Sequence, residues 1–132
     1  GIPVNGAAST HILKPDNANL PGSVQNEALC MQLARRCGLN VADATTGTAG
    51  DRSFLLVTRY DRVQRNGMVR RIHQEDFCQA MGRPPAAKYE HNQTGIPGPS
   101  LAEMFSLISE HMTARDTNRF LDAVIFNVAI GN

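Results

Sequence analysis

Ser9-Thr-His-Ile-Leu-Lys14 is short, contains β-branched residues and stops at Pro15, which predicts a strand. A loop with Asn, Pro and Gly follows it. Residues 24–37 then repeat apolar side chains every four positions, which predicts a helix with Ser23 as its N-cap and Gly38 as its C-terminal stop. A strand, a loop and an amphipathic helix therefore open the chain.

The segment after residue 50 predicts more sheet. Phe54-Leu-Leu-Val57 is a continuous apolar run after the Gly50-Asp51 turn, which predicts a central, buried strand. Asn66-Gly67 lies between alternating residues in the segment 62–70, and this dipeptide is the strongest short signal of a hairpin.

The second half of the chain predicts helices. Residues 74–81 predict a short helix ended by Gly82, and residues 83–100 predict a long loop rich in proline and glycine. Ser100 and Glu103 form a capping box for a helix over residues 101–112.

A second capping box, Thr113 and Asp116, predicts the start of a last helix. Its wide apolar face predicts deep packing. That face consists of Phe120, Leu121, Val124, Ile125, Val128 and Ala129. Sheet and one helix come first and helices follow, so the fold class is α+β.

Composition narrows the class of protein. The 132 residues correspond to one domain or part of one, and 42% hydrophobic with 19% charged residues excludes a disordered chain. The net charge of +1 excludes a DNA-wrapping basic protein, and no apolar run is long enough to span a membrane. The N-terminus shows no signal peptide, and the odd count of three cysteines fits reduced thiols, so we expect a cytoplasmic protein.

Two features suggest nucleotide chemistry. Lys14 ends a strand and Glu27 lies on the following helix, which is how a kinase holds the α- and β-phosphates, although a surface lysine and a solvated glutamate give the same pattern. The buried strand that runs into Thr58-Arg-Tyr-Asp61 could be a hinge, where an adenine takes backbone hydrogen bonds. The alternative is an ordinary strand that leaves the core.

Two further stretches each allow two interpretations from their residues alone. The arginines between positions 52 and 71 could contact nucleic acid or an acidic partner, although a solvated, charged edge is the simpler interpretation. The stretch from His73 to Gly82 could bind a metal or do acid–base work, but its periodicity favours a helix N-terminus with acids opposing the helix dipole.

A set of short motifs occurs in order along essentially the whole chain. They are Thr10-His-Ile-Leu-Lys-Pro15, Asn26-Glu27 with Leu33-Ala34, Gly38-Leu39, Thr58-Arg-Tyr-Asp-Arg62, His73-Gln-Glu-Asp-Phe-Cys-Gln79, Lys88-Tyr-Glu90, Phe126-Asn127 and Ile130-Gly-Asn132. Together they resemble the HipA family of bacterial serine/threonine kinases, which are the toxins of toxin–antitoxin modules.

The resemblance implies a partial protein-kinase-like fold. Residues 1–60 would be a partial N-lobe with an antiparallel sheet, one helix and the hinge, and residues 61–132 would be a hairpin and the first helices of the C-lobe. Lys14 would bind the nucleotide phosphates with Glu27 as its partner. The remaining cofactor-binding residues would be Thr58, Arg59 and Tyr60 in the hinge under the adenine, and Gln74 near the nucleotide.

The resemblance also implies the activity and its partners. The family transfers the γ-phosphate of ATP, with magnesium, to a protein serine in targets such as aminoacyl-tRNA synthetases, and this causes growth arrest. The partner would be a HipB-like helix-turn-helix antitoxin, so DNA would be reached only through that antitoxin, and no membrane is involved.

The chain departs from the family pattern at two places. Thr58 stands where many members carry an acid, and the loop 91–98 is longer than usual. The catalytic aspartate and the metal-binding residues would lie beyond Asn132, so we expect no catalytic and no metal-binding residue here, and no activity from this chain alone. The alternative is a nonenzymatic protein-interaction module derived from a kinase fold.

Overall fold

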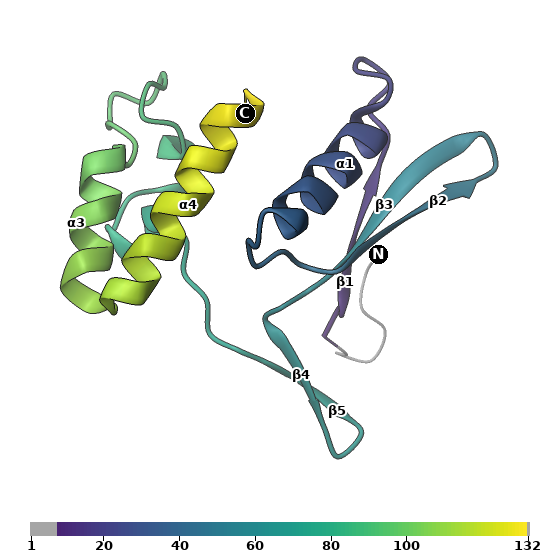
Figure 1. The fold of residues 1–132 in the computed structure, drawn as a ribbon, viewed down its shortest axis with the longest axis horizontal. Coiled ribbons are helices and arrows are strands. Elements are labelled where there is room, and N and C mark those ends of the chain that lie inside the picture. The colour runs from purple at the N-terminus through teal and green to yellow at the C-terminus, as the bar shows by residue number, and fades with distance from the viewer. Residues whose placement is uncertain (1–7, 132) are drawn as a thin grey trace. The chain divides into compact units, whose positions relative to one another are not determined.

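The computed structural model describes residues 8–131. Residues 1–7, where the sequence shows no signal peptide, and Asn132, the end of the Ile-Gly-Asn run, lie outside the described residues. The chain divides into two compact units after Ile72, and each is described by itself. Strands and one helix form the first unit and helices form most of the second, which confirms the α+β class (Figure 1).

A three-stranded antiparallel sheet forms the base of the first unit. Its strands are β1 (His11–Pro15), β2 (Ala44–Ala49) and β3 (Arg52–Thr58), in the order β1-β3-β2. The apolar run predicted to be a central strand is β3, and its Leu55 is fully buried. Leu55 and Val57 pack with Val24 of α1 (Ser23–Arg36) into a small core, so the helix is held against the sheet.

The N-terminus of α1 differs from the prediction. Gly22, with φ +85°, is the N-cap in place of Ser23, and no side chain at that position caps the helix. Asp16 caps the helix from the end of β1 instead, and the Ser23 hydroxyl donates to it. The predicted stop is confirmed because Gly38 adopts the left-handed conformation, with φ +84°.

The predicted hairpin is confirmed. Strands β4 (Arg62–Arg65) and β5 (Met68–Arg71) pair with each other as a separate two-stranded sheet. Asn66 and Gly67 both have positive φ, 49° and 74°, as a tight hairpin turn requires. The hairpin belongs to the first compact unit, whereas the lobe boundary expected from the sequence follows residue 60.

The second unit begins with a helix shorter than predicted. Helix α2 covers only Phe77–Ala80, because Asp76 adopts an extended conformation and caps the helix through Gln79. The loop 83–100 contains one turn of 3-10 helix, η2 (Pro85–Ala87). Gly98 is buried in this loop and lies against the backbone oxygens of Tyr89 and Ala87.

Helices α3 (Leu101–His111) and α4 (Ala114–Ile130) begin as predicted. Both capping boxes are present, one at the start of each helix. Phe120 of α4 packs against Phe105 of α3 and Phe77 of α2, with ring centroids 5.0 and 5.5 Å apart. These aromatic contacts join the three helices of the second unit.

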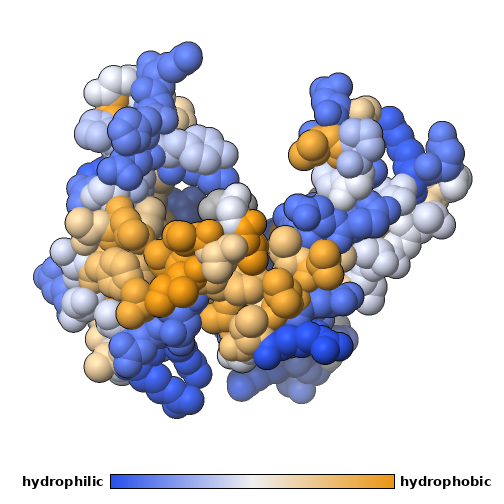
Figure 2. Space-filling view, turned by 45° about the horizontal axis from the view of Figure 1, so that its top comes forward, coloured by the Kyte–Doolittle hydropathy of each residue, from blue (hydrophilic) through white to orange (hydrophobic). Residues whose placement is uncertain are grey.

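The prediction that the last helix is deeply packed is wrong. None of the described residues of α4 is buried, and Leu121, Ile125 and Val128 are 43%, 57% and 75% exposed. Figure 2 shows apolar side chains on the surface of both units. Periodicity reports which face of a helix is apolar, but burial depends on what packs against that face. No helix within residues 8–131 is long and apolar enough to cross a membrane.

Candidate nucleotide-binding site

Strand β1 and helix α1 bring Lys14 and Glu27 together. Lys14 Nζ donates a 2.5 Å hydrogen bond to Glu27 Oε1. The two side chains are 47% and 40% exposed, so the ion pair lies at the surface of the unit. An ammonium carries three N–H donors, and only one is used by Glu27. Lys14 therefore contacts Glu27 and keeps spare donors for a phosphate oxygen.

Asp16 connects the same strand and helix. Its carboxylate accepts hydrogen bonds from the Ser23 hydroxyl at 2.6 Å and from the backbone N–H groups of Gly22 and Val24, both at 3.2 Å. These three donors hold the pKa of Asp16 below its usual value, with the Ser23 hydroxyl as the largest cause. The sequence analysis missed this residue because N-cap reasoning considers the position next to the helix, and Asp16 lies across a loop.

The expected hinge residues lie at and after the end of β3. The Thr58 N–H donates to Asp43 O at 2.7 Å and the Arg59 N–H donates to Thr10 O at 2.9 Å. The Tyr60 N–H donates to no acceptor within the part of the chain that the structure describes. Of the three expected hinge residues, Tyr60 therefore has the backbone donor available to a base.

Asp61 holds two arginines beside the hinge. It is only 8% exposed, and its carboxylate accepts from Arg59 Nε and Nη2 at 3.0 and 2.9 Å and from Arg62 Nη1 at 2.5 Å. Arg62 Nε also donates to Ser9 O at 2.9 Å. These guanidinium groups, chiefly that of Arg59, lower the pKa of Asp61 to about 2 despite its burial.

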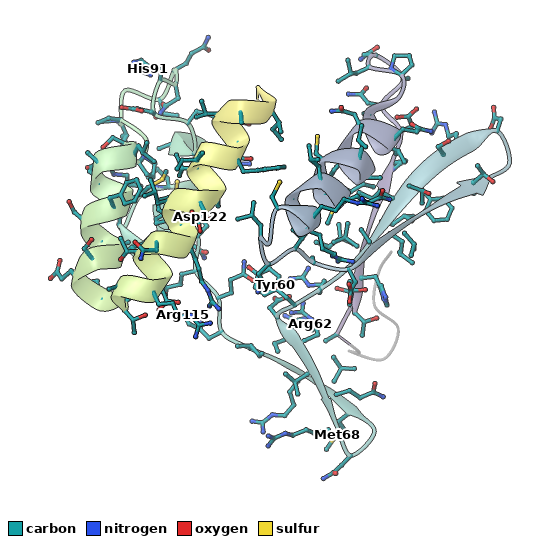
Figure 3. The ribbon with its side chains drawn as sticks, in the orientation of Figure 1. Tyr60, Arg62, Met68, His91, Arg115 and Asp122 are labelled. Carbon is teal, nitrogen blue, oxygen red and sulfur yellow. The ribbon has the colours of Figure 1, made fainter. Side chains whose placement is uncertain are left out.

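The ionic cluster fixes the side chain of Arg59 and the start of the hairpin. Arg59 uses Nε and Nη2 to bind Asp61, so its guanidinium is oriented towards that carboxylate. In Figure 3, Tyr60 and Arg62 lie where β3 leads into β4, and Met68 lies at the far end of the hairpin. The sequence analysis did not predict that Asp61 binds both arginines, although an acid between two nearby arginines is visible in the sequence.

Gln74, the sixth expected site residue, belongs to the second unit, on the extended segment before α2. The other five, Lys14, Glu27, Thr58, Arg59 and Tyr60, belong to the first unit. Near Gln74, Asp76 and Gln79 form a capping box, which confirms the helix N-terminus interpretation of this stretch. No three His, Cys, Asp or Glu side chains of residues 8–131 come together as metal ligands would.

The first unit fits a nucleotide at two points. His11 pairs with Thr58 and Lys14 pairs with Leu55, so Lys14 is about 10 Å along β1 from the hinge, three residues at the rise of a strand. An extended nucleotide carries its base and its phosphates at opposite ends. This matches the Tyr60 N–H, which has no acceptor among the described residues, and the donors of the Lys14 ammonium that Glu27 leaves unused. The residues present can therefore hold a base and a phosphate on one strand pair.

The chain is similar to known proteins over nearly its whole length. A family model for the HipA-like C-terminal domain matches residues 3–132. A putative kinase of Sinorhizobium fredii, Y4mE, is 47% identical over 99% of this chain, and the serine/threonine-protein kinase toxin HipA of Shewanella oneidensis is 34% identical over 95% of it. The chain spans about a third of these relatives, 31% of each.

A solved structure shows the same fold. It contains the toxin HipA of Shewanella oneidensis in a complex with HipB and operator DNA. This chain matches it with a TM-score of 0.82 and 34% identity, over 98% of this chain and 34% of that one. The family model, the relatives and the fold agree, and the chain belongs to the HipA-like C-terminal domain family.

Proposed function

We propose that the protein carrying this chain is a kinase that transfers the γ-phosphate of ATP to a protein serine. The observation that carries the proposal is the Lys14–Glu27 ion pair between β1 and α1. A strand lysine held by a helix glutamate is the device with which protein kinases position phosphates. The kinase names of the relatives support the same activity.

Each part of the site has a separate task in this proposal. Lys14 binds the phosphates and Glu27 holds its ammonium in place. Tyr60 donates its backbone N–H to the base. Thr58 and Arg59 hold the hinge through their N–H groups, which bind the residues just before β2 and β1. The family resemblance adds Gln74 as a further nucleotide-binding residue. Magnesium, when bound with ATP, neutralises charge on the β- and γ-phosphates.

The biological role follows from the family. The substrate is a protein serine in a translation factor or an aminoacyl-tRNA synthetase, and its phosphorylation arrests growth in the cytoplasm. A HipB-like helix-turn-helix protein is the antitoxin, and DNA is reached through it. The solved complex of the Shewanella toxin with HipB and operator DNA supports this partner.

The decisive experiment measures transfer from labelled ATP by the intact protein. Lys14→Ala should lower kcat/KM by at least about 100-fold, because a preorganised charge in an active site commonly contributes several kcal/mol. Glu27→Gln should lower it by a smaller factor. Arg36→Ala, which removes an exposed cation from the last turn of α1, is the matched control and should leave turnover unchanged.

Two outcomes would contradict the proposal. Full turnover after Lys14→Ala would remove Lys14 from the site. An intact wild-type protein that neither binds ATP nor transfers phosphate would support the nonenzymatic interaction module instead.

A further inference from the structure

The contacts of Asp16 join two elements that no backbone pairing joins. Its backbone belongs to the sheet, because the Asp16 N–H donates to Ser53 O at 2.9 Å and so extends the pairing of β1 with β3. Its carboxylate belongs to the helix, because three donors from the start of α1 bind it. A movement of α1 against β1 must therefore break hydrogen bonds to Asp16.

The spacing of the four residues explains why these contacts affect the ion pair. Lys14 and Asp16 are two residues apart on extended backbone, so both side chains leave the same side of the strand. Ser23 and Glu27 are four residues apart in α1, so they lie one above the other on one helix face. The Asp16–Ser23 and Lys14–Glu27 contacts are thus two parallel connections between one strand side and one helix face.

The two connections differ in exposure. The Asp16–Ser23 hydrogen bond is partly buried, whereas the Lys14–Glu27 hydrogen bond is exposed. An exposed pair of long side chains is readily exchanged for water. The shorter Asp16 side chain, bound by three donors, is the stiffer of the two connections.

The start of α1 also depends on Asp16. The N-cap residue is Gly22, which has no side chain, and helix N-termini leave backbone N–H groups without partners. Asp16 supplies an acceptor to Gly22 and Val24, and its negative charge favours the positive end of the helix dipole. No other side chain of the described residues is hydrogen-bonded to those two N–H groups.

We propose that Asp16 is a positioning residue, whose carboxylate sets the rotation and height of α1 on β1 so that Glu27 meets Lys14. The inference rests on the proposed function, because it concerns the lysine that holds the nucleotide phosphates. Asp16 does not touch the nucleotide. It acts through Glu27, and its effect on ATP binding therefore requires Glu27.

The test is a double-mutant cycle in the intact protein, with the dissociation constant for ATP and kcat/KM as readouts. Asp16→Asn should weaken ATP binding by about tenfold, because hydrogen bonds to a charged carboxylate are the stronger ones and 1.4 kcal/mol is a factor of ten. In a Glu27→Gln background the same substitution should change binding by less than about twofold. Asp51→Asn, which changes an exposed acid in the turn between β2 and β3, is the matched control and should have no effect.

A second double-mutant cycle combines Ser23→Ala with Glu27→Gln. Ser23→Ala removes the hydroxyl donor and leaves the hydrogen bonds from the Gly22 and Val24 N–H groups to Asp16. It should weaken ATP binding by about threefold alone and not at all with Glu27→Gln. If the Asp16→Asn protein does not fold, this cycle decides the question.

Failure of the inference and failure of the proposed function give different results. Equal factors in both backgrounds would show that Asp16 stabilises the fold without positioning Glu27, and would overturn the inference. The same is true if Lys14→Ala weakens ATP binding while Asp16→Asn and Ser23→Ala do not. If Lys14→Ala leaves ATP binding and turnover intact, the proposed function fails first.

Discussion

Lys14 of β1 and Glu27 of α1 form an ion pair, with Nζ and Oε1 2.5 Å apart, and both side chains are exposed to solvent. Neither side chain belongs to the small core of Val24, Leu55 and Val57 that holds α1 on the sheet. The pair is thus held in place by the fold, and it contributes little to holding the fold together.

Stability and activity should separate at this pair. Lys14→Ala is expected to change the free energy of unfolding by less than about 1 kcal/mol, because exposed ion pairs contribute roughly 0–1 kcal/mol. The same variant should lose phosphate transfer. Thermal unfolding of the intact protein, followed together with turnover, measures both. A variant that unfolds several degrees early would mean that Lys14 is a structural residue.

Asp61 should behave in the opposite way. Asp61→Ala leaves the guanidinium of Arg62, whose side chain is 8% exposed, without its carboxylate partner, and an unpaired charge with so little solvent is costly. We expect the unfolding midpoint to fall by several degrees. Asp51→Asn is the control, since Asp51 is exposed in a turn. An unchanged midpoint would show that the cluster of Arg59, Asp61 and Arg62 is dispensable.

Glu103 predicts a pH dependence of stability in the second unit. The Arg83 guanidinium, and then the backbone and hydroxyl of Ser100, lower the pKa of Glu103 from 4.5 to about 2. A carboxyl with a depressed pKa in the folded state stabilises it above the unfolded value, and this contribution is lost as the pH falls from about 4.5 to about 2. The unfolding midpoint of wild type should therefore exceed that of Glu103→Gln at pH 7, and the two should converge towards pH 2. A difference that stays constant across this range would contradict the assignment.

Gly98 should tolerate no side chain. A Cβ there would lie 2.1 Å from the carbonyl oxygen of Tyr89 and 2.6 Å from that of Ala87, and both are backbone atoms. Gly98→Ala should therefore destabilise the loop 88–98 strongly. Gly47→Ala is the matched comparison, because its Cβ meets only the Phe54 ring, at 2.5 Å, and a side chain can move. Limited proteolysis should cut the loop faster in the first variant, and equal cleavage in both would contradict the prediction.

The isolated chain of residues 1–132 should transfer no phosphate. The chain spans 31% of the kinases it is similar to, and the family resemblance predicts the catalytic aspartate and the metal-binding residues outside this part. Labelled ATP incubated with this chain and with the intact protein measures the difference, and a Lys14→Ala version of the chain is the background. Transfer above that background would show that the catalytic residues lie within these 132 residues.

Local sequence signals predicted most of the elements. The Asn66-Gly67 turn, the two capping boxes before α3 and α4, and the apolar run of β3 all depend on neighbours within a few residues. The same signals misjudged the length of α2, because the Asp76 side chain caps the helix and sets its first residue at Phe77. The Lys14–Glu27 pair was visible as a pattern, but that pattern alone did not distinguish a site from two solvated side chains.

By itself, therefore, the sequence determined the order of elements, the fold class and the family, because these depend on local periodicity and on motifs in a fixed order. Only the tertiary structure decided which charges meet. Asp16 caps α1 across a loop and Arg62 Nε donates to Ser9 O, contacts that depend on how the chain closes in three dimensions. The exposure of Leu121, Ile125 and Val128 was decided there as well, because an apolar face is buried only where another element packs against it.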